Sequence, residues 1–483
     1  MLNKKLVCSA LPIIFILIIA SFFRLYNLTS YPPSLYSDEA MNGNNALEAL
    51  STGQFKIFYP ENNGREGLFI NIQAAFIKYL GNSPWVLRLP SAIFGILTVL
   101  GLYFLAKQLF KNKYVALLSS FFLATSFWHI IFSRIGFRAI MAPLFLIWAI
   151  YFLLKTLENK KQYVWAIIGG IFYGLGFYSY IAYRATPLLM IIILIVFWKQ
   201  LIKNWKPVLL YILIAFIVVL PLGLYFLQNP ANFMGRTSQI SIFSSSNPLI
   251  DLGKNVAQTL GMFNVAGDWN WRHNIAGRPE LFWPVGIMFI LGLVMGIKEL
   301  FKKKKELWIL FGWLIATAAP VVVSNEGIPH ALRSIIMIPP IFIFAGIGGI
   351  WLFNFIKSKI PQKSSAISKF IILISLFFIS SALIIEAYNS YFIVWGKNPN
   401  VASAFNNDVT EMGYELNALP NSLPKYVIVG EADKPIIRDN YMVVQPIMFI
   451  TDTFTPEKQA QKNIHYIPSN QTAPKGSFEL FIK

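Results

Sequence analysis

Two adjacent acidic residues, Asp38 and Glu39, follow the first long apolar stretch and are the strongest candidates for chemistry in this chain. They come shortly after Arg24, so we expect them where the chain has just left a membrane. A carboxylate in a water-poor place can accept the proton of an attacking hydroxyl group, which is the work of a general base. Ser37 followed by two acids is also typical of a helix N-terminus. These residues alone leave both interpretations open.

The arginines fall on one predicted side of the membrane, whereas most lysines fall on the other. A planar guanidinium group binds phosphate or carboxylate through two parallel hydrogen bonds, while lysine offers a hydrated point charge. The basic residues that we consider for an anionic substrate are Arg24, Arg65, Arg88, Arg138, Arg184, Arg272, His330 and Arg333. Any one of these arginines can instead pair with an acid or reach lipid headgroups. As a group they favour an anion outside the membrane.

Two residues near these arginines have equally ordinary interpretations. For His330, a capping or loop hydrogen bond is as good an interpretation as a phosphate contact. Asp268 is either an acid that supports a neighbouring group or a solvated turn residue, and we favour the turn. The sequence predicts no metal ligand.

The composition places these residues in a polytopic membrane protein. With 56% hydrophobic and only 13% charged residues, the chain cannot form a soluble globule with a polar surface. Apolar stretches long enough to cross a hydrocarbon core of about 30 Å recur along the chain. We predict about eleven transmembrane helices, near residues 6–23, 85–109, 114–131, 139–155, 163–181, 185–198, 207–227, 282–297, 307–323, 333–356 and 370–387.

The charge distribution predicts how the chain is oriented. The lysine-rich connections between the spans are cytoplasmic by the positive-inside rule, which places the N-terminus in the cytoplasm. The formal charge of +19 lies largely in such short loops, so nucleic acid is not expected as a partner. The predicted external parts are loops 24–84 and 228–281 and the tail 388–483. We therefore divide the chain into a membrane domain, 1–387, and an extracytoplasmic domain, 388–483.

The external parts carry their own patterns. Residues 38–52 and 67–80 have helical spacing but are too short to span, so we expect two helices at the membrane surface. In the tail, residues 400–418 are typical of a helix, and this segment joins predicted strands in a small α/β domain. The predicted strands are residues 426–429, 442–450 and 478–482.

Several short motifs follow one another at the external ends of the spans. After the Arg24 to Glu39 segment come Trp85 to Arg88, Phe132 to Arg138, Tyr178 to Arg184, Gly267 to Asn274 and Pro329 to Arg333. In this order they resemble the GT-C superfamily of membrane glycosyltransferases, in its protein O-mannosyltransferase and aminoarabinose transferase branch. The resemblance covers most of the membrane domain and implies an all-α GT-C fold in the cell (cytoplasmic) membrane.

The resemblance also implies an activity. It is transfer of a sugar from a polyprenyl-phosphate donor to a hydroxyl group of a glycan, lipid or protein acceptor on the outer face. In this scheme Asp38 is the general base, Glu39 helps to bind or orient, and Arg24 and Arg88 match important arginines of the family. Some relatives carry an acid where this chain has Ala139, which puts in doubt any role of a second acid there and a divalent metal site. No cofactor is certain, and a divalent metal ion stays open.

The residues themselves agree with this chemistry. A lipid phosphate leaves without needing a protonating acid, so one base suffices, and direct displacement inverts the anomeric centre. The alternative is a transporter or flippase of a lipid-linked glycan, which needs ionisable residues at mid-membrane in several spans. Spans such as 114–131 have almost none at their centres, which favours an enzyme. The sequence does not identify the sugar or the acceptor.

Overall fold

The structure is a computed structural model, and its two compact units are described separately. It describes residues 4–158, 160–239, 241–302, 304–359, 365–430, 436–437 and 440–482. The membrane unit comprises Met1–Tyr26, Ser91–Ser133 and Arg138–Trp395. The loop-and-tail unit comprises Asn27–Pro90, Arg134–Phe137 and Gly396–Lys483. The predicted domain boundary at residue 387 stays a prediction, although the first external loop and the tail share one compact unit.

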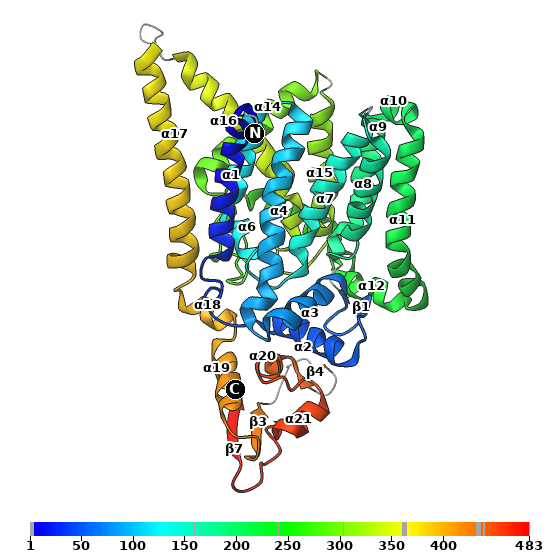
Figure 1. The fold of residues 1–483 in the computed structure, drawn as a ribbon, viewed down its shortest axis with the longest axis vertical. Helices are drawn as coiled ribbons and strands as arrows, with labels where there is room; N and C mark the ends of the chain where they lie inside the picture. The colour runs from blue at the N-terminus through cyan, green and yellow to red at the C-terminus, as the bar shows by residue number, and fades with distance from the viewer. Residues whose placement is uncertain are drawn as a thin grey trace. The chain divides into compact units, whose positions relative to one another are not determined.

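The secondary-structure elements that the structure describes in the membrane unit are all helices, joined by loops (Figure 1). Its longer helices are α1 (Lys4–Leu25), α4 (Pro84–Phe110, which begins in the other unit), α5 (Lys113–Ala124), α7 (Met141–Thr156), α8 (Gln162–Gly176), α9 (Thr186–Val196), α11 (Trp205–Gln228), α12 (Pro230–Gln239), α13 (Pro248–Gly261), α14 (Trp283–Leu300), α15 (Lys305–Val322), α16 (Ile338–Lys359) and α17 (Ser365–Tyr388). Short helical segments between them are α6 (Phe127–Phe132), η1 (Arg138–Ile140), η2 (Ile181–Ala185), α10 (Trp198–Lys203), η3 (Ile242–Ser244), η4 (Arg333–Met337) and the π-helix η5 (Asn389–Trp395).

Seven described helical stretches are long and apolar enough to cross a membrane, by length and composition. They are Pro84–Phe110, Arg138–Thr156, Trp205–Gln228, Trp283–Leu300, Lys305–Val322, Arg333–Lys359 and Ile372–Trp395. Other predicted spans coincide with shorter apolar helices, such as Lys113–Ala124 and Ile181–Val196. The predicted multi-pass, mainly helical membrane protein is confirmed, while the number eleven stays a prediction.

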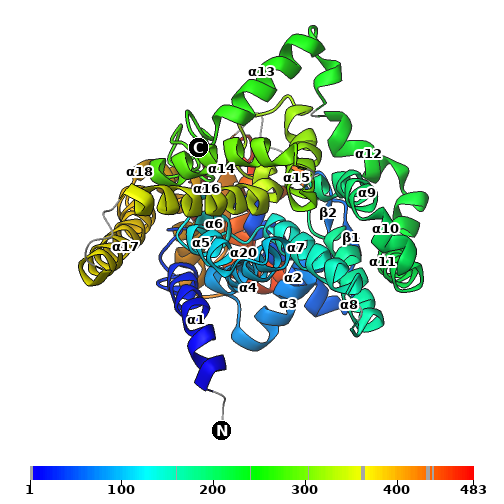
Figure 2. The ribbon, with the colours of Figure 1, turned by 90° about the horizontal axis from the view of Figure 1, so that it is seen from above.

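Two helices of the membrane unit touch backbone to backbone. A Cβ atom at Gly292 of α14 would lie 1.8 Å from the Phe344 carbonyl oxygen of α16, and one at Gly348 would lie 1.9 Å from the Met288 oxygen. Any side chain at either position would therefore push the helices apart. Small residues that let backbones approach closely are typical of helix packing in membranes. Figure 2 shows α14 and α16 side by side.

The first external loop contributes two helices to the loop-and-tail unit. They are α2 (Ser37–Thr52) and α3 (Leu68–Leu80), which confirms both helices predicted from apolar spacing. A small antiparallel pair, β1 (Phe58–Tyr59) and β2 (Arg65–Glu66), connects them. The two helices share a buried core to which Ala46 of α2 and Ala74 of α3 contribute. This core holds the N-terminus of α2 in place.

The tail forms a three-stranded parallel sheet in the order β6-β3-β7. Its strands are β3 (Lys425–Val429), β6 (Ile464–Pro468) and β7 (Phe478–Ile482), so two of the three predicted strands are confirmed. The predicted helix 400–418 is present as α18 (Pro399–Ala404) and α19 (Asn407–Ala418). The remaining elements of the tail are β4 (Ile436–Ile437), β5 (Asn440–Tyr441), η6 (Met442–Val444), α20 (Gln445–Thr451) and α21 (Pro456–Lys462).

The strand predicted over 442–450 is wrong, because this segment is η6 followed by α20. Pro446 explains the error, since proline has no N–H for a strand ladder but suits the first turn of a helix. The α20 helix packs on α2: Phe449 belongs to the same buried core as Ala46. In addition, Asn44 Nδ2 donates a hydrogen bond of 2.8 Å to Gln445 Oε1. The tail therefore supports the helix that carries Asp38.

Candidate functional site

The two candidate acids begin helix α2 but have opposite environments. Tyr36 precedes the helix in an extended conformation, so Asp38 and Glu39 fall in the first helical turn, where acids are favoured. Successive side chains of a helix point about 100° apart, so one acid can face the interior while its neighbour faces outward. Glu39 is fully buried and Asp38 is partly exposed. Residue type made these acids equal candidates, and burial separates them.

The Glu39 carboxylate accepts four hydrogen bonds within the loop-and-tail unit. Oε1 accepts from Arg88 Nε at 3.0 Å and from the Gly136 N–H at 2.6 Å. Oε2 accepts from Arg88 Nη2 at 3.1 Å and from the Tyr36 N–H at 3.3 Å. Glu39 therefore ties the start of α2 to the start of α4 and to the turn 134–137. A carboxylate that is so fully bonded is built to position its neighbours.

Arg88 is buried and is held on every side. Besides the two bonds to Glu39, Nη1 donates to the Pro32 oxygen at 2.8 Å and Nη2 donates to the Ser34 oxygen. The side chains of this ion pair are 1% exposed at Arg88 and 0% exposed at Glu39. Removing either partner would therefore leave a buried charge. The predicted role of Arg88 in binding a donor phosphate stays a prediction.

Arg65 belongs to the same network. Nη1 donates to Asn42 Oδ1 at 2.8 Å and Nη2 donates to Asn45 Oδ1 at 2.6 Å. Its planar fork therefore bridges one face of α2. Asn42 Nδ2 in turn donates to the Gly136 oxygen at 3.1 Å. We call Asp38, Glu39, Asn42, Arg65 and Arg88 the first-loop site. Sequence analysis missed the two asparagines, whose spacing of three residues on a helix was the available signal.

Asp38 is the member of the first-loop site whose carboxylate can meet a substrate. Asn62 Nδ2, from the loop between β1 and β2, donates a hydrogen bond of 2.7 Å to Asp38 Oδ1. Asn62 adopts a left-handed conformation with φ 52°, which asparagine tolerates better than most residues. This one bond orients the carboxylate and leaves it partly exposed.

Three predicted arginines lie in the membrane unit, each with its own contacts. Arg24 is buried, and its guanidinium donates to the Ala124 oxygen at 3.1 Å and lies 2.7 Å from His129 Nδ1. Arg138 and Arg184 are partly exposed, with guanidinium carbons 5.9 Å from the Tyr180 ring and 4.6 Å from the Phe233 ring, respectively. A partly exposed guanidinium can reach an anion more easily than a buried one.

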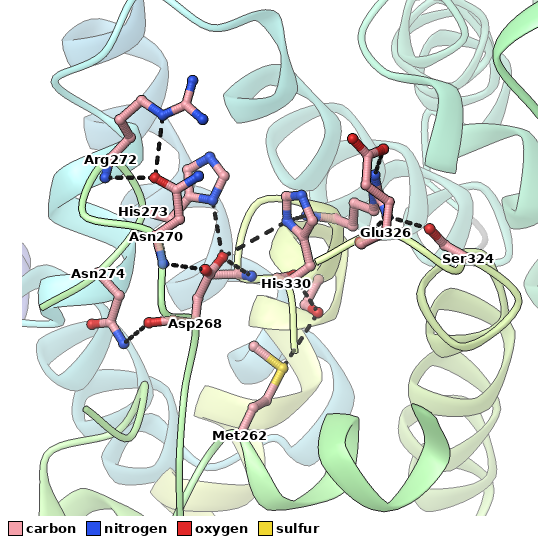
Figure 3. Close-up of polar contacts among 12 residues, drawn as sticks. Met262, Asp268, Asn270, Arg272, His273, Asn274, Ser324, Glu326 and His330 are labelled. Carbon is pink, nitrogen blue, oxygen red and sulfur yellow. Dashed lines mark hydrogen bonds and ion pairs between the residues drawn. The ribbon is translucent and has the colours of Figure 1, made fainter. Parts of the chain in front are cut away.

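A second polar group lies in the loops of the membrane unit and consists of Asp268, His273 and His330, the Asp268 cluster. Asp268 Oδ2 lies 2.9 Å from His273 Nδ1 and 3.8 Å from His330 Nδ1. Figure 3 shows both imidazole rings turned toward this carboxylate. Asp268 Oδ1 accepts the Asn270 N–H, two residues along the chain, as in an Asx turn. Asp268 is buried, so the prediction of a solvated turn residue is wrong.

Burial and hydrogen bonding shape the charges of this cluster. Burial alone would raise the pKa of Asp268, but the hydrogen bond and charge of His273 outweigh it and lower that pKa. Burial, followed by the charges of His273 and Arg333, holds the pKa of His330 well below its usual range. At neutral pH the cluster therefore combines an ionised carboxylate with a neutral imidazole at His330. Only the meeting of two loops brings His273 and His330 to the same carboxylate.

Two predicted arginines flank the Asp268 cluster. Arg333 Nη2 donates to Glu326 Oε2 at 2.8 Å, so its charge is compensated locally. Arg272 is partly exposed, and its Nε donates to Asn270 Oδ1 at 3.2 Å. Seven of the ten predicted site residues thus fall into two groups, one in each unit: Asp38, Glu39, Arg65 and Arg88 in one, and Arg272, His330 and Arg333 in the other. Arg24, Arg138 and Arg184 belong to the membrane unit and to neither group.

The comparisons with known proteins agree with the fold. Residues 68–225 match a family model described as dolichyl-phosphate-mannose-protein mannosyltransferase. No curated protein matches the chain. This matched segment runs from α3 to α11 and includes Arg88, Arg138 and Arg184.

Solved structures resemble the chain over nearly its whole length. The undecaprenyl-phosphate-bound ArnT from Cupriavidus metallidurans has a TM-score of 0.57 and 12% identity, and the match covers 95% of this chain and 90% of ArnT. A second match is AglB, the archaeal oligosaccharyltransferase from Archaeoglobus fulgidus, in complex with an inhibitory peptide and a dolichol-phosphate. Its TM-score is 0.52 at 12% identity, and the match covers 94% of this chain and 69% of AglB. The same organism's oligosaccharyltransferase with Zn and sulfate has a TM-score of 0.53 and 13% identity, covering 94% and 62%. These matches confirm the predicted fold, which the chain shares with ArnT and with the archaeal oligosaccharyltransferase. The family model supports the resemblance to protein mannosyltransferases over residues 68–225.

Proposed function

We propose that this protein transfers a sugar from a polyprenyl-phosphate donor to an acceptor hydroxyl group, with Asp38 as the general base. The observation that carries the proposal is the contrast within the first turn of α2. Glu39 is buried and accepts four hydrogen bonds, whereas Asp38 is partly exposed and is oriented by Asn62. A base must reach the proton that it abstracts, and Asp38 meets this requirement better than Glu39.

The proposed step is a direct displacement at the anomeric carbon. Asp38 takes the proton of the acceptor hydroxyl group while the hydroxyl oxygen forms a bond to C1 of the sugar. The bond between C1 and the phosphate oxygen breaks, and the lipid phosphate leaves with the electron pair. Attack from the side opposite the leaving group inverts the anomeric configuration. The phosphate is a good leaving group, so no second carboxyl group has to protonate it.

The basic residues divide between positioning and binding in this proposal. Arg65 and Arg88 hold α2 in place, because their guanidinium groups are engaged in buried bonds. Arg138, Arg184 and Arg272 are partly exposed, and we assign the donor phosphate to arginines of this kind. Arg24 and Arg333 are buried and His330 is nearly so, and we assign them supporting roles. Arg24 donates to backbone oxygens of α1 and α5, and Arg333 pairs with Glu326.

The relatives support a lipid-linked donor. Structures with this fold have been solved with undecaprenyl phosphate and with a dolichol-phosphate, and the matching family model is described by a dolichyl-phosphate-mannose donor. We extend this donor class to the present chain, in the cytoplasmic membrane with the N-terminus inside and the tail outside. The acceptor is a glycan, lipid or protein hydroxyl group.

The test is a transfer assay with the full chain in liposomes. Radiolabelled dolichyl-phosphate mannose and a set of undecaprenyl-phosphate-linked hexoses and pentoses serve as donors, and the measured quantity is sugar released from the lipid phosphate. Asp38→Asn is expected to lower the rate by about 100- to 10,000-fold, the usual contribution of a general base. Asp408→Asn, which changes the first-turn acid of α19, is the matched control.

Two outcomes would contradict the proposal. Release of sugar at an unchanged rate by Asp38→Asn would remove Asp38 as the base. Movement of the intact lipid-linked sugar across the bilayer, without release from any donor, would favour a flippase.

A further inference from the structure

The Asp268 cluster joins two loops that are far apart in the sequence. Asp268 and His273 lie between α13 and α14, and His330 lies between α15 and η4. The whole chain has only four histidines, and two of them meet at this one buried carboxylate. Buried polar groups need partners, but two neighbouring imidazole rings at one carboxylate oxygen exceed what a single loop turn requires. This convergence calls for a chemical explanation.

We infer that Asp268, His273 and His330 form a binding site for a divalent transition-metal ion, with Zn²⁺ as the best-suited ion. Among the described residues, these three offer ligand atoms that all lie within 4.8 Å of one another. Ligands at about 2.1 Å from a tetrahedral Zn²⁺ ion are separated by about 3.4 Å. The separations of 2.9 and 3.8 Å from Asp268 Oδ2 to the two Nδ1 atoms bracket this value.

The types of ligand decide which ion fits. Two imidazoles and one carboxylate suit Zn²⁺ and its transition-metal neighbours, whereas Mg²⁺ and Ca²⁺ prefer oxygen ligands alone. Three protein ligands leave a tetrahedral ion one open position. The single negative charge of Asp268 does not neutralise a divalent ion, and partly exposed Arg272 adds a further positive charge nearby. The open position therefore favours an anion or a water that loses its proton.

The carboxylate is already oriented by the backbone. The N–H groups of Asn270 and Ala331 donate to Oδ1 at 2.8 Å and to Oδ2 at 2.9 Å. Glu280 Oε1 accepts the N–H of Asp268 itself at 3.0 Å, and the Gly277 N–H donates to the Asp268 oxygen at 2.9 Å. Hydrogen bonds of this kind around a ligating group fix its orientation and strengthen metal binding. The backbone therefore already holds the Asp268 carboxylate in one orientation.

The bound ion has a mechanical consequence. Asp268 and His273 come from one loop and His330 from the other, so the ion links the two loops. Any ligand that binds the folded chain but not the unfolded chain raises its stability. Zn²⁺ is therefore expected to raise the Tm of the full-length protein.

The test measures bound metal on the full chain in detergent, independently of sugar transfer. The protein is treated with a chelator, dialysed, loaded with Zn²⁺ and quantified by elemental analysis, and Co²⁺ loading reports the ligand geometry through its visible absorption. The unchanged chain is expected to bind about one ion, and Asp268→Asn, His273→Gln and His330→Gln are each expected to weaken binding by more than about tenfold.

Control variants keep the result decisive. His465→Gln removes a histidine of β6 that stacks on Tyr426 and should leave both the stoichiometry and the metal-dependent rise in Tm unchanged. Tm in the presence of chelator identifies any variant that fails to fold, and His330→Ala then serves as the second variant at the least buried position. Absence of Zn²⁺ and Co²⁺ binding by the unchanged chain would overturn the inference, as would equal binding by all cluster variants. Loss of transfer by Asp38→Asn with intact metal binding supports both proposals separately.

Discussion

Two variants of the first-loop site, Glu39→Gln and Asp38→Asn, should have different effects. We expect the first to lower the stability of the protein and the second to lower its activity. Glu39→Gln removes the charge that compensates Arg88. It also replaces one carboxylate oxygen, which accepts two hydrogen bonds, by an amide NH2 group that cannot accept them. Asp38→Asn changes the next residue but disturbs only its contact with Asn62. We expect Glu39→Gln to unfold the unit readily and Asp38→Asn to fold normally.

The magnitude follows from the burial of the ion pair. Removing one partner of a buried salt bridge costs about 3–5 kcal/mol, because the other charge stays buried without compensation. The exposures of 1% and 0% leave no water to replace the lost carboxylate. At about 2–4 °C per kcal/mol for a unit of about 150–250 residues, Glu39→Gln should lower the Tm by at least about 6 °C. Asp38→Asn loses one partly exposed hydrogen bond, which is worth about 1 kcal/mol.

The assay is thermal unfolding of the purified full-length variants in the same detergent, with transfer measured on the same samples below the lower Tm. Equal Tm values for the two variants would refute the assignment of Glu39 as a buried anchor. A Glu39→Gln protein that is as stable as the unchanged chain would show that Arg88 finds another partner or reaches water.

Three further predictions concern other parts of the molecule. Gly348→Ala places a Cβ atom 1.9 Å from a backbone oxygen of α14 and should cost about 1–3 kcal/mol in thermal unfolding. Gly223→Ala, with no atom within 4 Å, should be neutral or mildly stabilising. Arg65→Lys loses the planar bridge to two asparagines and should lower the stability of the unit by about 1–3 kcal/mol, and an unchanged Tm would mean that lysine reaches both. Burial raises the pKa of Tyr466 to about 12, whereas an unfolded tyrosine has a pKa of about 10. The stability that the buried, neutral Tyr466 contributes is therefore complete below about pH 10 and is lost as the pH rises toward about 12. Tyr466→Phe should flatten this part of the profile of Tm against pH, and identical slopes would contradict the reasoning.

The helices were predicted more successfully than the strands of the tail. Apolar spacing in 38–52 and 67–80 identified α2 and α3, because a helix that buries one face repeats its apolar residues regularly. The segment 442–450 was assigned wrongly, since a short apolar run does not distinguish a buried strand from a buried helix. Strand β6 was not predicted, because its pairing with β3 depends on tertiary contacts.

The candidate site could be predicted by residue type but not by role. Asp38 and Glu39 were equal candidates by residue type, and the family resemblance alone suggested Asp38 as the base. The structure adds the pairing of Glu39 with Arg88, 49 positions away, which no local pattern predicts. Asp268 was predicted as a solvated turn residue; its bond to the Asn270 N–H fits a turn, but its burial contradicts a solvated side chain. The approach of His330 to the same carboxylate depends on how two loops fold together, and no local pattern contains that information.

The glycine contact between α14 and α16 also limits how the membrane unit can open. Where two helices meet through their backbones, Cα–H groups and carbonyl oxygens lie close enough for weak hydrogen bonds, and neither helix can tilt away without losing them. The pair should therefore move as one rod during a reaction cycle. The proposed lipid-linked donor would then have to enter between other helices. The apolar stretch Ile372–Trp395, in α17 and η5, is only 11% buried within the structure and is therefore far less tied to its neighbours.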